Sequence, residues 1–169
     1  MKKFSFVLNL IILLIICLFG LNCKSKFYSK EKVPNDFDFI IEDGYNDSFD
    51  SRTCIFQRKY ISDLKKIKVN FTNEEKVKIY KIIEGLNFNS LSEKKLKSKC
   101  SHCAFTIPSS TFSLTVFVNG KEKKISLYDG LEFDNKKARL FANSNTEIWT
   151  VIYKNKDISS VKESDYYYE

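Results

Sequence analysis

The sequence of 169 residues contains a single histidine, His102, and only five glycines. A Ser-His-Asp triad would depend on that one histidine, and no nucleophile elbow is present. The glycines form no phosphate-binding loop. Arginine is also scarce: 25 of the 28 basic residues are lysine, whereas proteins that read nucleic acid rely on bidentate arginine. The sequence therefore lacks the common hydrolase and nucleotide-binding motifs, predicts no cofactor, and disfavours nucleic acid as a partner.

No acidic side chain occurs before Glu31. The chain starts with Met-Lys-Lys, and residues 4–21 are apolar apart from two polar side chains. A charged start followed by an apolar core is the layout of a secretory signal peptide. The apolar stretch is also near the length of a short membrane span, so an uncleaved anchor is an alternative. We expect residues 1–22 to be a signal peptide and the rest of the chain to be exported.

Residues 18–25 read Leu-Phe-Gly-Leu-Asn-Cys-Lys-Ser, so Cys23 separates the apolar segment from a polar one. This ending resembles the lipobox of bacterial lipoproteins, in which the cysteine is acylated and becomes the first residue of the mature chain. The usual box has leucine three residues before the cysteine, where this chain has Gly20. Asparagine directly before the cysteine is similar to the relaxed boxes of spirochaetes. The resemblance implies attachment to membrane lipid through Cys23, on the periplasmic or cell-surface side, with an ordinary cleaved signal as a further alternative.

The rest of the chain is expected to form one domain. Residues 23–35 read as the lipidated cysteine and a charged, flexible tether, residues 36–158 as an α+β domain, and residues 159–169 as a loose polar tail. Eleven of the fifteen phenylalanines and five of the nine tyrosines fall within residues 36–158 and supply enough apolar area for a core. The formal net charge is +7 for the whole chain and +5 without residues 1–22; it indicates solubility and suits an envelope polysaccharide, anionic lipid or protein partner.

Three strands are expected in the first half of the domain. Residues 37–42 alternate apolar and polar side chains, which predicts a strand, and residues 43–51 read as turn material. Residues 52–71 predict a hairpin with its turn at Ser62-Asp63. That register pairs Phe56 with Val69 and Cys54 with Phe71, and it gathers their side chains on one apolar face.

The second half predicts a helix, a hairpin and a closing helix. A capping box at residues 72–75 opens a helix that ends near Gly85. Residues 111–128 predict a hairpin around Asn119-Gly120, with Leu114 opposite Ile125. A second capping box, at residues 144–147, opens a closing helix that carries Trp149 in the core. The predicted order βββαββα indicates a single antiparallel sheet of about five strands with two helices on one face.

This pattern is similar to that of small exported bacterial domains of unknown function. The matching residues are Asn87-Phe88 after the first helix and Asn119-Gly120-Lys121 at the hairpin turn. The resemblance implies the fold class and an uncharacterised binding role, and it carries no catalytic residue.

The domain retains three cysteines if Cys23 is acylated, namely Cys54, Cys100 and Cys103. An odd number in an oxidising compartment predicts one disulfide and one spare thiol. Because Cys100 and Cys103 lie in a long connection with little apolar content, we expect a disulfide from Cys54 to one of them. The preferred function is a non-enzymatic binding module tethered to a membrane.

The alternative function uses the loop Cys100-Ser101-His102-Cys103. It resembles the Cys-Pro-His-Cys of periplasmic disulfide oxidases, which implies a redox pair, although the strand before it and the helix after it are missing. Cys54, Cys100, His102 and Cys103 also form a soft ligand set suited to zinc or copper. A c-type haem motif is excluded, since alanine follows Cys103.

Overall fold

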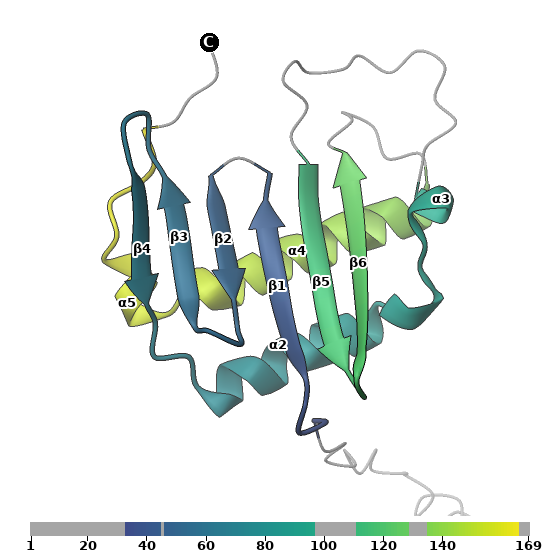
Figure 1. Cartoon of the computed structure of the whole chain (residues 1–169). Coiled ribbons are helices and arrows are strands. Elements are labelled where there is room, and N and C mark those ends of the chain that lie inside the picture. The colour runs from purple at the N-terminus through teal and green to yellow at the C-terminus, as the bar shows by residue number, and fades with distance from the viewer. Residues whose placement is uncertain (1–32, 45, 97–110, 129–134, 166–169) are drawn as a thin grey trace, which may run out of the picture. The chain divides into compact units, whose positions relative to one another are not determined.

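The computed structural model describes residues 33–44, 46–96, 111–128 and 135–165 (Figure 1). The chain divides into the units Met1–Lys32 and Val33–Glu169, and the described residues belong to the second. They form one six-stranded antiparallel sheet in the order β4-β3-β2-β1-β5-β6. Its strands are β1 (Asp38–Asp43), β2 (Asp47–Asp50), β3 (Ile55–Lys59), β4 (Leu64–Lys68), β5 (Thr111–Val118) and β6 (Lys121–Tyr128).

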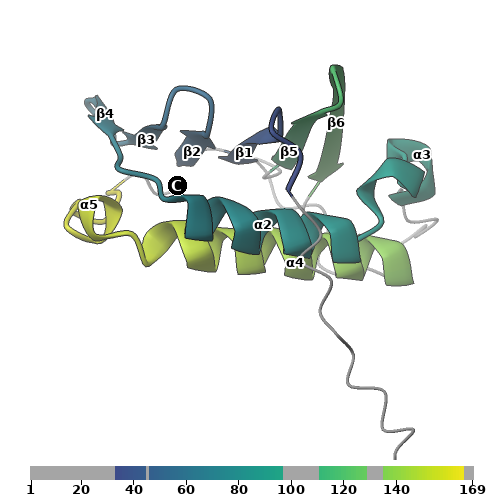
Figure 2. The same ribbon diagram turned by 90° about the horizontal axis from the view of Figure 1, so that it is seen from below.

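Two long helices, α2 (Asn73–Gly85) and α4 (Lys136–Tyr153), lie on the same face of the sheet (Figure 2). Three short elements accompany them: η1 (Phe88–Ser90), α3 (Glu93–Leu96) and α5 (Lys156–Ser159). The predicted α+β class, with a single antiparallel sheet, is therefore confirmed. Within the described ranges, no helix is both long enough and apolar enough to cross a bilayer.

The core lies between the sheet and these helices. Apolar side chains at every second position of a strand and at every third or fourth position of a helix meet there. In β1 and the residue before it, the buried set is Phe37, Phe39 and Ile41, as the alternation predicted. The helices contribute side chains such as Ile79 and Phe141, which are fully buried.

The β5–β6 hairpin has the predicted register. Leu114 pairs with Ile125 across the two strands, and both side chains are buried. Asn119 and Gly120 have φ angles of 53° and 65°, which are the left-handed values that a two-residue type I′ turn requires. Local turn chemistry and strand alternation therefore agree at this hairpin.

Helix α2 begins at the predicted capping box. The Thr72 hydroxyl accepts a hydrogen bond from the Glu75 backbone, and the Thr72 backbone donates to the Glu75 carboxylate at 2.7 Å. Burial alone would raise the pKa of Glu75, but hydrogen bonds from Thr72 and from the Asn155 amide lower it. The carboxylate thereby ties the start of α2 to the residue that precedes α5.

The predicted count of about five strands was wrong, since part of the segment expected to be turn material forms β2. The order of the main elements is ββββαββα rather than βββαββα. Phe49 is fully buried, and its ring lies 5.8 Å from that of Phe39 and 4.9 Å from that of Phe71. The β1–β2 connection passes close to β5: a Cβ atom on Gly44, where φ is +25°, would lie 2.6 Å from the carbonyl oxygen of Thr111.

The predicted register of the β3–β4 hairpin was wrong by two residues. Phe56 pairs with Ile67, not Val69, because the turn is centred on Ile61 and Ser62, one residue earlier than predicted, and the Tyr60 N–H bonds to the Asp63 carbonyl. A shift of two positions preserves the faces, so Phe56 still points into the core. Cys54, however, does not lie in a strand, because it occupies the turn before β3 with a φ of 52°.

The start of the closing helix was also predicted wrongly. Helix α4 begins after Asn135, whose side chain accepts a hydrogen bond from the Lys137 backbone at 2.9 Å. The second capping-box pattern lies inside the helix, where Ser144 and Asn145 are buried. Ala138 and Phe141, which precede that pattern, pack in the core and hold the first turns of the helix.

Candidate functional site

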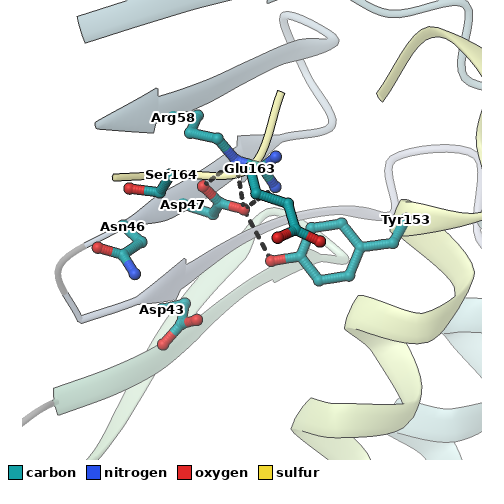
Figure 3. Close-up of a pocket in the computed structure, with 7 residues that line it drawn as sticks. All are labelled: Asp43, Asn46, Asp47, Arg58, Tyr153, Glu163 and Ser164. Carbon is teal, nitrogen blue, oxygen red and sulfur yellow. Dashed lines mark hydrogen bonds and ion pairs between the residues drawn. The ribbon is translucent and has the colours of Figure 1, made fainter. Parts of the chain in front are cut away.

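Asp47 of β2 and Arg58 of β3 form a buried ion pair at one end of the sheet (Figure 3). The two residues lie directly opposite each other in the β2–β3 register. Two bonds join them, from Arg58 Nε to Asp47 Oδ1 at 2.9 Å and from Nη2 to Oδ2 at 2.6 Å. Asp47 is 5% exposed and Arg58 9%, so water can replace neither partner. Burial makes each charge dependent on the other.

Tyr153, at the end of α4, completes a three-residue cluster. Its hydroxyl donates to Asp47 Oδ2 at 2.8 Å, and its ring stacks on Trp149 at 5.1 Å. Burial and the negative charge of Asp47 raise the pKa of Tyr153 far above its usual value. The phenol therefore stays protonated and acts as a donor, so the cluster connects the last turn of α4 to the sheet.

The same arginine holds the C-terminal segment. Arg58 Nη1 donates to the carbonyl oxygens of Val161 at 3.3 Å and Lys162 at 3.0 Å. The Tyr60 hydroxyl also donates to Lys162 at 2.7 Å, and the Ser164 hydroxyl donates to the Lys59 carbonyl at 2.6 Å. The expectation of a loose tail from residue 159 was therefore wrong as far as residue 165.

A polar hollow of about 210 Å³ adjoins this cluster. It is lined by Asp43, Asn46, Asp47, Arg58, Tyr153, Glu163 and Ser164 (Figure 3). The hydrogen bonds that Arg58 donates to Asp47 raise the pKa of Arg58, so the arginine and the tyrosine both keep their protons at neutral pH. Neither group can accept a proton from a substrate. The arrangement joins four segments of the chain, namely β2, β3, the end of α4 and the C-terminal segment.

A second polar cluster lies on the sheet face opposite the helices. The Ser113 hydroxyl donates to the Glu42 carboxylate, and Lys124 Nζ lies 2.8 Å from the same carboxylate oxygen. Hydrogen bonds to the Glu42 carboxylate, mainly from Lys124 and secondly from Ser113, lower the pKa of Glu42. A carboxylate with a lowered pKa is a weak base, so it does not activate the serine as a nucleophile. This cluster connects β1, β5 and β6.

Strand β4, at one edge of the sheet, is strongly exposed. Four of its five residues are exposed, and three of the five are lysines. Ile61, in the connection before β4, is 73% exposed, and Leu64 is 46% exposed. An edge strand with unpaired backbone groups and protruding apolar side chains is a surface on which another chain can pair.

The predicted cysteine site is described only at Cys54. This residue is half-buried, its thiol is free, and its Sγ donates to the Ser51 carbonyl at 3.4 Å. Cys23, Cys100, His102 and Cys103 lie outside the described residues, so lipidation, the disulfide and the alternative metal set stay predictions. Among the side chains that the structure describes, no three histidines, cysteines or carboxylates gather as metal ligands.

Sequence reasoning missed the cluster of Asp47, Arg58 and Tyr153. The sequence did contain a signal: Asp47 and Phe49 are two residues apart, which places both on one face of a strand, and the same spacing separates Phe56 from Arg58. The partner Tyr153 is 106 residues away from Asp47, and no local pattern links them.

Comparison of the chain with protein-family models, with curated proteins and with solved structures finds no match. The N-terminal sequence and the chemistry of the described surface are therefore what indicate the function.

Proposed function

We propose that this chain is an exported protein, anchored to a membrane through acylated Cys23, whose domain is a non-enzymatic binding module. The observation that carries the proposal is the N-terminal pattern of two lysines, an apolar segment and a cysteine before a polar stretch. Two or more acyl chains give stable membrane attachment, whereas one gives only reversible binding. The domain would then act next to the membrane surface.

Binding rather than catalysis is supported by how the described ionisable groups are used. Asp47 is engaged by Arg58 and Tyr153, and Glu42 is engaged by Lys124. These groups hold elements of the fold together. The pKa of Glu42 is lowered and the pKa values of Arg58 and Tyr153 are raised, so all three side chains keep their usual protonation states at neutral pH. The lysine-rich surface favours a partner with negative charge, either a protein or an envelope polysaccharide.

The anchor is tested by membrane fractionation of Cys23→Ala, with Cys54→Ala as the control that removes a cysteine from the domain. We expect the wild type and Cys54→Ala in the membrane fraction. Cys23→Ala should be released, or should accumulate as the unprocessed chain. An unchanged distribution and mobility of Cys23→Ala would show that an uncleaved apolar segment holds the protein.

The alternative function, a thiol or soft-metal protein, is favoured by one observation: the only histidine in the sequence, His102, lies between Cys100 and Cys103. Zinc or copper content of the purified protein, measured together with thiol titration, separates it from the first proposal. Three thiols that bound metal protects from labelling would favour the metal protein. A disulfide between Cys100 and Cys103 that readily oxidises a reduced protein would favour the redox protein.

A further inference from the structure

The backbone of β4 directs hydrogen-bonding groups away from the sheet. The bonds from Tyr60 N to Asp63 O at 2.8 Å and from Val69 N to Cys54 O at 2.9 Å mark the residue pairs that bond across β3 and β4. Such pairs alternate along an antiparallel ladder. The residues between them therefore point their N–H and C=O groups outward: Leu64, Lys66 and Lys68. Because β4 is the last strand in the sheet order, no described strand lies beyond it.

Carboxylates of the same chain occupy the two ends of this outer edge. The Leu64 N–H donates to Asp63 Oδ1 at 2.7 Å, and the Asn70 N–H donates to Asp157 Oδ2 of α5 at 2.8 Å. Between them, the outward N–H groups of Lys66 and Lys68 have no acceptor among the described residues. The edge is thus closed at both ends by acidic side chains, with two open donors in the middle.

The side chains of this edge are basic and apolar. Lys66 and Lys68 lie on the helix-free face, since the neighbouring Ile67 packs against the core. Lys65 and Lys66 are both exposed. Lysine on an edge strand disfavours pairing with a second copy, because like charges would lie opposite each other. Protection from aggregation does not explain the exposed Leu64, however, which is a side chain that a partner strand along β4 would cover.

We propose that β4 is the docking edge for an extended acidic segment of a partner protein, which pairs with it as one further strand. This inference rests on the proposed binding function and names its site and the chemistry of its partner. The partner strand bonds through its backbone to the open groups of Lys66 and Lys68. Its acidic side chains lie opposite these lysines, and an apolar side chain lies opposite Leu64. Main-chain bonds supply affinity in this mode of recognition, and alternate side chains supply selectivity.

The test uses the full-length protein in detergent micelles and a fluorescent peptide that contains Glu-Val-Glu-Glu-Leu. In antiparallel pairing, its central glutamate faces Lys66 and directs its N–H toward β4, whereas the valine faces Ile67 and directs its N–H away. We expect saturable binding by fluorescence anisotropy. N-methylation of the central glutamate should abolish this binding, and N-methylation of the valine should leave it intact. A matching Lys-Val-Lys-Lys-Leu peptide should not bind.

Charge reversal on the protein gives the second arm. Lys65→Glu combined with Lys66→Glu should weaken peptide binding about tenfold, because two attractive cross-strand pairs become repulsive. Lys78→Glu combined with Lys154→Glu makes the same charge change at an exposed position of α2 and at the exposed C-cap of α4, and it should leave binding unchanged.

Four results would overturn the proposal. Absence of binding would show that β4 is not a docking edge. Equal binding of the two methylated peptides would reduce the interaction to charge attraction, and equal binding of the lysine peptide would remove the acidic preference. A dimer in light scattering that Lys66→Glu abolishes would make a second copy the occupant. Membrane anchoring through Cys23 is measured separately, so its failure is distinguishable from each of these.

Discussion

The substitution Asp47→Asn removes the negative charge that faces Arg58 and nearly preserves the shape of the side chain. The arginine then remains buried with a positive charge and no counter-charge. Removing one partner of a buried ion pair costs about 3–5 kcal/mol. Arg58 keeps the carbonyl oxygens of Val161 and Lys162 as acceptors, and the new amide oxygen can accept one bond. We therefore expect the free energy of unfolding to fall by about 2–3 kcal/mol, at or slightly below the lower end of that range. For a domain of about 140 residues, this lowers the melting temperature by about 7–11 °C.

The matched control is Asp50→Asn, the same substitution in the same strand. Asp50 pairs with Arg52, which is exposed, so its loss should cost about 1 kcal/mol or less. Urea unfolding followed by the fluorescence of Trp149, the only tryptophan, measures both variants. Adding Arg58→Met to Asp47→Asn should recover part of the loss, because it removes the unpaired charge. Equal losses for Asp47→Asn and Asp50→Asn, or no recovery in the double variant, would refute the account of this cluster.

Three further predictions concern the frame of the domain. Gly44→Ala should lower the urea midpoint more than Gly120→Ala, because a Cβ atom on Gly44 would clash with the backbone of Thr111. A Cβ atom on Gly120 would face open space, so that substitution costs only the left-handed backbone strain of about 1–2 kcal/mol. Equal midpoints would contradict this. Because the pKa of Glu75 is lowered from its ordinary value of 4.5, its carboxylate stabilises the fold above pH 4.5, and this stabilisation is lost as the pH falls below 4.5. The urea midpoint of Glu75→Gln should therefore depend less on pH in that range than the midpoint of the wild type. Parallel curves of midpoint against pH for the two proteins would argue against this. Leu114→Ala should cost about 2–5 kcal/mol, and a midpoint within error of the wild type would disprove its burial.

Where local chemistry decides the structure, the sequence predicted it residue by residue. The turn at Asn119-Gly120 sets the pairing of β5 with β6, and the capping box at residues 72–75 sets the start of α2. In both places, the bonds that define the element form between residues close in the chain. The single sheet with helices on one face then followed from the order of elements.

Where distant contacts decide the structure, the sequence prediction failed. The segment around Asp47 reads as a polar turn until Arg58 and Tyr153 neutralise and cover its carboxylate. The capping-box pattern at residues 144–147 was misleading because core contacts of Phe141 carry the helix through it. The polar tail is ordered as far as residue 165 because Arg58 binds its carbonyl groups. Tyr153 lies 106 residues from Asp47, and Arg58 lies 103 residues from Val161 in the tail that it binds.

The central claim is that the chain is exported and acylated at Cys23, and intact mass tests it most directly. The protein is extracted from membranes and weighed under non-reducing conditions. We predict a mass that lacks residues 1–22 and carries acyl groups on Cys23. A further loss of two hydrogen atoms would report the disulfide that the sequence predicts at Cys54, whose thiol is free in the structure. The full mass of the 169-residue chain without acyl groups would contradict the claim.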